Sequence, residues 1–405
     1  MLEKFVSNRI EYKLDDNCYS YYNSKLFSKE MFSKFYSEID IIDFLTCGVE
    51  VTAISGDSPN SFKRIIKPYE DIIFKSTEDI SRSLIENLQI NIATSIRGYD
   101  SKYLLLSAGK DSLMILAALE ELDLVNDFEF ITFKNNISSK DESHLVKEIV
   151  SRYGKSVLII DPINLNFIDI FDYINSCHRP CSDPTSMMYS LLNGKIETNS
   201  IIIDGMGNDV YIGHMPSKKI FYKFFITDSL NKIGLINHPS WKSIGFKGND
   251  WYMFNDRLEK YLKKEPRESY EAYRARIRGG IFDIEVCMLK TINFAISNNS
   301  KAYFPWSESN IANYVKYIGK RNFYKFGKNK IPLRNYLESK FNLNFDSLGK
   351  KGFSVNHNDL TKLKPIDLCD KLNDVLPKKI QSDYYNCRLE LLSQTRLSLL
   401  NYWLL

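Results

Sequence analysis

Four short runs of large apolar residues are the feature that most limits what this chain can fold into. Each run consists mostly of Leu, Ile, Val or Phe, and helical patterns stand between the runs. Strands that are apolar on both sides belong to a sheet covered on both faces, and strand–helix alternation favours parallel pairing. The sequence therefore predicts an α/β fold, with a parallel sheet that carries helices on both faces. The predicted strands are residues 102–107, 127–133, 156–161 and 200–205.

Helical periodicity is clearest beside these strands. Residues 76–96 start with a serine and early acidic residues, and their apolar residues then recur at helical spacing, which predicts a helix leading into the sheet. Two further helices are predicted at 111–122 and 141–154, the second ending on Gly154.

The two ends of the chain have different patterns. Residues 1–75 mix short apolar runs with polar turns, which indicates a small N-terminal α+β region. Beyond residue 215 the chain becomes aromatic and basic, and we interpret it as packed helices without a clear strand. We therefore divide the chain into an N-terminal region, 1–75, and a main domain, 76–405, that ends in a helical part.

Composition narrows the class of protein. The chain of 405 residues is 44% hydrophobic and 26% charged, as expected for an ordinary globular protein. The 54 basic and 50 acidic residues are too balanced to favour a nucleic acid as partner. No apolar run approaches the roughly 18 residues of a membrane span, and the first residues do not resemble a secretory signal. We expect a cytoplasmic protein that does not engage a membrane.

The cysteines do not suggest a disulfide framework. There are seven, an odd number, and most are scattered, which fits reduced thiols in the cytoplasm. The one cluster is "CHRPC", residues 177–181, which includes His178. Because no second Cys or His pair at ligand spacing accompanies it, we interpret these cysteines as buried thiols and disfavour a zinc site.

A polar, glycine-containing turn follows the first predicted strand, within "YLLLSAGKDSLMIL". In a parallel sheet this turn lies where strand carboxyl ends and helix N-termini meet, and ligands bind there. Small residues let backbone N–H groups approach phosphate oxygens, and a following helix adds its positive end. Asp111 offers a ligand for Mg²⁺. The turn matches neither a Walker A loop nor a dinucleotide fingerprint. The alternative is an ordinary capped turn between a strand and a helix.

This turn resembles the PP-loop "SGGxDS" of the ATP pyrophosphatase superfamily, with Ala108 in place of one glycine. Further stretches, in the same order, resemble asparagine synthetase: "KDESHLVKEI", "RPCSDPTSMMYSLL", "IIIDGMGNDVYIGHM", and "KNKIPLRNYLESKFNL" followed by "KKGFSV". The resemblance covers roughly residues 75–360 and implies an adenine nucleotide α-hydrolase-like fold.

The resemblance implies a reaction and a set of site residues. The enzyme would use ATP and Mg²⁺ to adenylate a carboxylate, and an amine or ammonia would then attack to give an amide and AMP. Asp111 and Asp209 would hold Mg²⁺, and Lys330 would neutralise charge at the α-phosphate, although Lys330 also stands in a very basic stretch typical of a solvated surface. Binding of ATP and pyrophosphate would involve Ser107, Ala108, Gly109, Lys110, Asp111, Ser112 and Gly205.

Several departures from the family concern substrates. Leu2 stands where glutamine-dependent asparagine synthetases have their catalytic cysteine, so we do not expect this chain to hydrolyse glutamine. Met206 and Val210 replace acidic residues, which weakens the case for aspartate as substrate. Asp183 and Met206 are candidate substrate-binding residues, although Asp183 is equally suited to cap a helix.

This pattern resembles β-lactam synthetases, lasso-peptide cyclases and sugar amidotransferases. It implies a small-molecule or peptide carboxylate as substrate, and leaves room for a separate protein that supplies ammonia or carries the substrate.

Two other functions remain open. "GKDS" is also typical of PP-loop enzymes that modify tRNA or nucleosides. A nucleotide-binding protein that has lost activity is the other alternative, for which Ala108 and Met206 would be signs.

Overall fold

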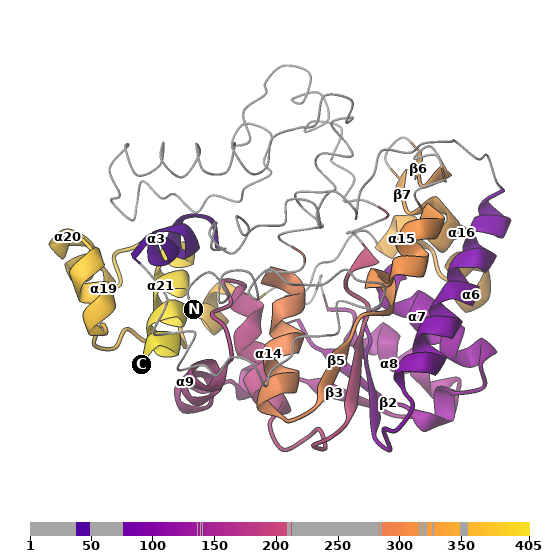
Figure 1. Cartoon of the computed structure of the whole chain (residues 1–405), viewed down its shortest axis with the longest axis horizontal. Helices are drawn as coiled ribbons and strands as arrows, with labels where there is room; N and C mark the ends of the chain where they lie inside the picture. Colours follow the sequence, from indigo (N-terminus) through magenta and orange to yellow (C-terminus); the bar gives the residue numbers. More distant parts are fainter. Residues whose placement is uncertain are drawn as a thin grey trace, which may run out of the picture.

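A five-stranded parallel sheet forms the centre of the protein, as the sequence predicts (Figure 1). The computed structural model describes residues 38–48, 76–208, 212, 283, 286–348 and 355–405, apart from 136, 138, 140, 316–317, 319–321 and 326–327. The strand order is β3-β2-β1-β4-β5. The strands are β1 (Lys102–Leu105), β2 (Glu129–Phe133), β3 (Val157–Ile160), β4 (Ile201–Asp204) and β5 (Lys301–Tyr303).

The order of the strands places the connecting helices on opposite faces of the sheet. From β1 through β2 to β3 the chain steps toward one edge, through helices α7 (Lys110–Glu121) and α8 (Ser143–Ser151). From β4 to β5 it steps toward the other edge, through α14 (Leu289–Ser297). Because such crossovers are right-handed, steps in opposite directions put their helices on opposite faces. This arrangement explains why β1 and β4 are almost wholly apolar and buried.

The prediction of no clear strand beyond residue 215 is wrong. β5 pairs in parallel with β4, with Ile202 opposite Ala302. It is only three residues long and begins with a lysine, so its sequence carries no strand signal; pairing with the buried edge of β4 makes it a strand. A second, two-stranded antiparallel sheet, β6 (Tyr324–Lys325) and β7 (Lys328–Asn329), also lies in this part of the chain.

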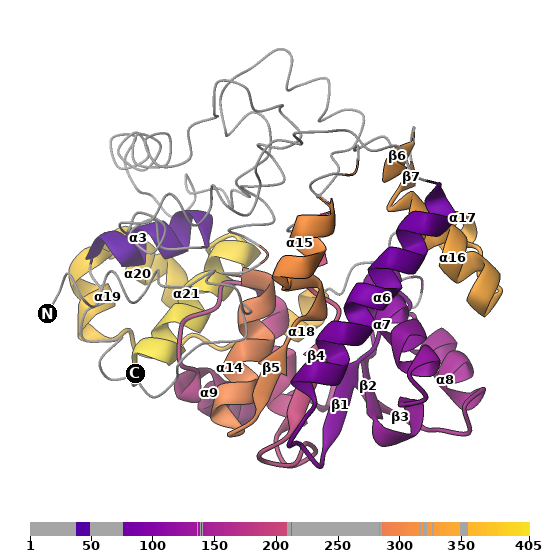
Figure 2. The ribbon, with the colours of Figure 1, turned by 45° about the vertical axis from the view of Figure 1, so that its right-hand side comes forward.

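Three helices pack together beside the sheet: α6 (Thr77–Ser95), α7 and α16 (Ile331–Phe341) (Figure 2). The predicted start of α6 is confirmed, because the Ser76 side chain accepts a hydrogen bond from the Asp79 N–H and so caps the helix. α8 is shorter than predicted; it ends at Ser151, and Gly154 follows it with a φ of +67°.

The C-terminal part is helical, as predicted. α21 (Leu391–Leu404) packs on α9 (Phe167–Ser176) and on α3 (Glu38–Cys47), and α3 also contacts α19 (Asp370–Val375) (Figure 1). The other helices there are α15 (Ser309–Val315), α17 (Phe345–Leu348), α18 (His357–Leu360) and α20 (Lys378–Tyr385). Apart from residues 38–48, the predicted N-terminal α+β region lies outside the described residues. No helix in the described ranges has the length and apolar character needed to cross a bilayer.

Candidate active site

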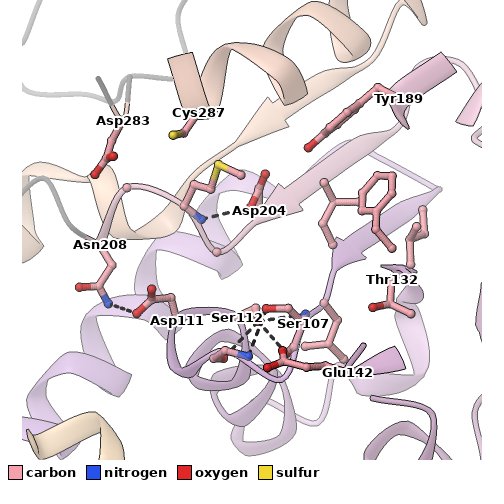
Figure 3. A pocket seen from close by; sticks show the side chains of 18 of the residues that line it. Ser107, Asp111, Ser112, Thr132, Glu142, Tyr189, Asp204, Asn208, Asp283 and Cys287 are labelled. Atoms are coloured by element: carbon pink, nitrogen blue, oxygen red, sulfur yellow. Dashed lines mark hydrogen bonds between the residues drawn. The ribbon is translucent and has the colours of Figure 1, made fainter. Parts of the chain in front are cut away.

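A cavity of about 380 Å³ opens at the carboxyl ends of β1, β2 and β4. β1 and β4 are neighbours, but the chain leaves them in opposite directions across the sheet, so the cavity lies where the strand order reverses. This is the place where open parallel sheets bind ligands, and the volume is in the range of small-molecule sites. Figure 3 shows Ser107, Asp111 and Ser112 along one side of the cavity, and Asp204, Tyr189 and Cys287 along the other.

The predicted phosphate loop forms one wall, and its own hydroxyls fix its shape. The Ser107 N–H donates to the Ser112 hydroxyl over 3.1 Å, and the two hydroxyls lie 3.0 Å apart. Gly109 caps α7 without a side chain, and its N–H donates to the Ser107 hydroxyl. The helix therefore begins at the cavity with its first turn facing it, which provides the positive end that an anion requires.

The six predicted loop residues do not all reach the cavity. Ser107, Gly109, Asp111 and Ser112 line it. Ala108 is buried in the apolar core instead, with 3% of its surface exposed. The Lys110 ammonium lies 4.8 Å from the centre of the Phe345 ring, in a cation–π contact rather than in the cavity wall. A phosphate contact from Ala108 would come from its backbone.

Gly205 allows the loop after β4 to lie directly against the phosphate loop. A Cβ at this position would stand 2.8 Å from the backbone nitrogen of Ser112 and 2.9 Å from its Cα. Only glycine fits such an approach between two backbones. The next residue, Met206, lines the cavity as predicted for a substrate contact, and it places a thioether there.

Asp111 is the point where distant parts of the chain meet. The Lys330 ammonium donates to both of its carboxylate oxygens, over 2.7 and 2.9 Å. The Asn208 amide nitrogen donates to one of them over 2.8 Å, and the Trp306 indole N–H donates to the Asp111 backbone carbonyl over 3.0 Å. The carboxylate is thus oriented by Lys330 and Asn208, and Trp306 fixes the backbone of the same residue.

Lys330 reaches Asp111 from the residue before α16. Its backbone is left-handed, with φ +54° and ψ +47°, and 7% of the residue is exposed. A lysine held in this conformation carries backbone strain, and such strain is most common at functional sites. The structure therefore brings Lys330 and Asp111 together, whereas predicted ligand Asp209, its neighbour Val210 and the "KKGF" stretch, 350–353, lie outside the described residues.

Asp183, the other predicted substrate contact, is not among the residues that line this cavity. It caps the 3₁₀ helix η4 (Pro184–Leu192) by accepting from the Thr185 N–H, and it forms a 2.8 Å ion pair with Lys290. Burial opposes the charge on Asp183, but the Lys290 ammonium outweighs it and holds the pKa of this carboxyl below its usual value. The acid stabilises the wall behind the cavity instead.

The far wall contains a chain of hydrogen bonds that the sequence did not indicate. The Thr291 hydroxyl donates its one hydrogen to Asp204 over 2.6 Å, so the Tyr189 hydroxyl, 2.9 Å away, donates to Thr291. Asp204 also accepts from the Met206 N–H. Burial raises the pKa of Asp204, although these donors oppose the shift. These hydrogen bonds hold the side chains of Tyr189 and Asp204 in place beside Met206, so this side of the cavity is polar.

Other residues of the cavity were also missed. The lining residues at the carboxyl end of β2, and directly after it, could have been predicted, because ligands bind at the carboxyl ends of parallel strands. Asp283 and Cys287 had no such signal, because they precede a helix far along the chain. The missed lining residues are Leu105, Leu106, Ile131, Thr132, Phe133, Asn135, Glu142, Tyr189, Asp204, Gly207, Asn208, Asp283 and Cys287.

The "CHRPC" segment is buried away from the cavity lining. Cys177 and Cys181 are free thiols, and in the described part of the chain no group of three His, Cys, Asp or Glu side chains could hold a metal. Burial, followed by the charge of Arg179, lowers the pKa of His178 from its ordinary 6.5 to about 4. This histidine is therefore neutral in the folded protein at neutral pH.

His178 should make stability depend on pH. Since its pKa is lower in the folded state, the unfolded state binds the extra proton between pH 6.5 and 4, and stability falls as pH decreases through that window. The loss should approach roughly 3 kcal/mol. Urea unfolding of the wild type and of His178→Asn at several pH values measures it. The variant should lose less stability than the wild type on acidification, and equal losses would contradict the assignment.

Comparison with known proteins does not identify a family for this chain. No protein-family model matches the chain, and no curated protein matches it. The function must therefore be argued from the site itself.

Proposed function

We propose that this protein is an ATP-dependent ligase that forms an amide and releases AMP and pyrophosphate. It would adenylate a substrate carboxylate, and an amine or ammonia would then displace AMP. This is the reaction of asparagine-synthetase-like enzymes, whose PP-loop the "SAGKDS" turn resembles.

One observation carries the proposal: Lys330 and Asp111, 219 positions apart, meet at the start of the helix that follows the phosphate loop. A structural ion pair would not need to stand at the ligand-binding edge of the sheet. The position of Gly205 against Ser112 supports the same function, because it leaves backbone N–H groups and small side chains where phosphates would approach.

Each residue has a role in this proposal. The first turn of α7 and the hydroxyls of Ser107 and Ser112 would bind the departing pyrophosphate. Lys330 would place its positive charge near the α-phosphate, where negative charge develops during transfer. Met206 and the Tyr189–Asp204 wall would contact the acyl substrate. Because the thioether of Met206 stands where the resembling family has an acidic residue, we expect a substrate less polar than aspartate.

Mg²⁺ fits the residues that the structure describes at this site. It usually takes one or two protein carboxylates, with phosphates and water as its other ligands. Asp111 meets this need, since its side chain lines the cavity and is 32% exposed. Asp209 is the second proposed ligand. When bound, Mg²⁺ would neutralise charge on the phosphates.

The substrate would be a small-molecule or peptide carboxylate. The nitrogen would come from an amine of the substrate itself or from ammonia that a separate protein supplies. A protein that carries the substrate is a second candidate partner. We place the enzyme in the cytoplasm, where ATP is present and free thiols such as Cys177 and Cys181 stay reduced.

Two other functions are weaker. The nucleoside-modifying alternative depends on Lys110 in "GKDS", yet this lysine stacks on Phe345 and does not line the cavity. A protein that binds nucleotides without catalysis would have no need to keep the Lys330–Asp111 pair. Copurification with RNA would favour the first, and tight ATP binding without AMP formation would favour the second.

The test is release of pyrophosphate from ATP and Mg²⁺ in the presence of panels of carboxylates and amines. We expect AMP and pyrophosphate in equal amounts, only with a suitable carboxylate. Asp111→Asn should lower this rate by at least about 10²-fold, because it removes a charge that helps to bind the metal. Wild-type turnover in Asp111→Asn would contradict the proposal.

A further inference from the structure

We propose that Asn208 is a cation-binding residue of this site, acting with Asp111 to hold the divalent metal that ATP brings. This inference rests on the proposed function, because it concerns the same cavity. The inference goes beyond the proposed function because it assigns a role to a residue that the family resemblance does not supply. In asparagine synthetase the stretch that "IIIDGMGNDVYIGHM" resembles reads "lSGeGaDElfgGY", with alanine at the position of Asn208.

The Asn208 side chain is buried at the cavity wall, with 1% of the residue exposed. Its amide nitrogen donates to an Asp111 carboxylate oxygen over 2.8 Å (Figure 3). Its amide oxygen is also buried, and among the described residues no donor reaches it. A buried acceptor without a partner is unfavourable, so a structure that keeps one requires an explanation.

The orientation of the amide follows from its charges. If the amide oxygen faced Asp111, two acceptors would be in contact and would repel each other. The nitrogen therefore faces the carboxylate while no cation is bound, and this leaves the oxygen without a partner.

A divalent cation reverses this preference. Once a cation binds Asp111, an amide oxygen beside the carboxylate becomes a ligand, or accepts a hydrogen bond from a metal-bound water, and the amide N–H becomes the unfavourable neighbour. Carboxylate and amide oxygens are the hard donors that Mg²⁺ and Mn²⁺ select. Rotation of the Asn208 amide about its terminal bond would thus exchange an Asp111 partner for a cation ligand. The oxygen that lacks a partner would gain one.

Mn²⁺ is the probe, and free Mn²⁺ is measured by electron paramagnetic resonance. It is titrated into the full chain with and without an ATP analogue that has a methylene group between the α and β phosphorus atoms. Asn208→Leu should weaken Mn²⁺ binding in the presence of the analogue by about tenfold or more. Asn208→Asp, which places oxygens at both positions, should strengthen Mn²⁺ binding. In the absence of metal this variant should have a lower melting temperature than the wild type, and added Mn²⁺ should restore the melting temperature.

The matched control is Asn401→Asp. Asn401 is also fully buried and bonded through both amide atoms, to Cys369 and Asp367, but it lies on α21, away from the cavity lining. Its change should lower stability without any rescue by Mn²⁺. Wild-type Mn²⁺ affinity in both Asn208 variants, or rescue of Asn401→Asp to the same degree, would overturn the inference.

The proposed function can fail separately. If Mn²⁺ binding depends on Asn208 but no carboxylate leads to pyrophosphate release from ATP, the cation site is supported and the ligase function is contradicted. If pyrophosphate is released but the Asn208 variants bind Mn²⁺ with wild-type affinity, the ligase function is supported and the role of Asn208 is contradicted.

Discussion

Replacing Lys330 with glutamine should lower ATP-dependent pyrophosphate release about 10²- to 10³-fold. The ammonium is fixed in place before substrate arrives: it is almost fully buried and donates to both oxygens of Asp111. A positive charge held so close to the phosphate loop can stabilise developing negative charge without reorganisation, which a neutral amide cannot do. The fold should survive, since Asp111 keeps its bond from Asn208 and is partly exposed. The measurement is the initial rate at saturating ATP, with circular dichroism to verify folding.

Lys328→Gln is the matched control for this change. Lys328 stands two residues earlier and pairs with Asp346 over 2.6 Å, but both side chains are about half exposed. Exposed ion pairs contribute little, so this variant should retain nearly full activity. Similar losses in both variants would mean that a general loss of positive charge, and not the position of Lys330, is responsible.

Gly205→Ala should prevent the site from assembling. The new methyl group would meet the Ser112 backbone at 2.8–2.9 Å, and neither neighbour can rotate away. Either β4 or the start of α7 must shift, at a cost of about 1–3 kcal/mol in the free energy of unfolding. The shift also moves the phosphate loop, so we expect the loss of ATP binding to exceed the loss of stability. Urea unfolding and calorimetric titration with the ATP analogue measure the two effects.

Gly109→Ala provides the comparison for stability. Its φ is −72°, which any residue adopts, and its new methyl group would meet only the Ser107 hydroxyl, at 3.0 Å. The free energy of unfolding should therefore change by less than about 1 kcal/mol, because only the end of a side chain must move. If Gly205→Ala unfolds at the same urea concentration as the wild type, the close approach at Ser112 is not a constraint on this protein.

The parts of the fold that could be predicted are those where a local pattern and the tertiary structure agree. β1, β2 and β4 are short, mostly apolar runs, and their apolar side chains are mostly buried in the sheet. β3 is wholly apolar as well, but it lies at the edge of the sheet and leaves Leu158 and Ile159 partly exposed. The start of α6 could be placed at one residue because Ser76 satisfies a backbone N–H that the helix itself leaves unpaired. β5 could not be predicted, since its three residues become a strand only through pairing with Ile201 and its neighbours.

The site divides in the same way. The phosphate loop could be identified because its small and hydroxylated residues are contiguous. Asn208 and Trp306 were missed, because what matters for each is a contact with Asp111 that only the fold creates. Asp183 was assigned to substrate on the basis of a motif, but its partner Lys290 lies in an apolar stretch, and nothing in that stretch reveals that this lysine is buried.

The pairing of β1 with β4 has a consequence for the folding of the chain. Lys102 pairs with Ile201, so this central pair closes a long loop that contains β2 and β3, whereas β1, β2 and β3 pair over shorter separations. Closing long loops costs more entropy, and folding is slower when such contacts dominate. The two halves of the cavity, Ser107–Ser112 and Asp204–Asn208, meet only when that loop closes. A ligand that binds both halves would therefore stabilise the pairing of β1 with β4, whose formation costs the most loop-closure entropy.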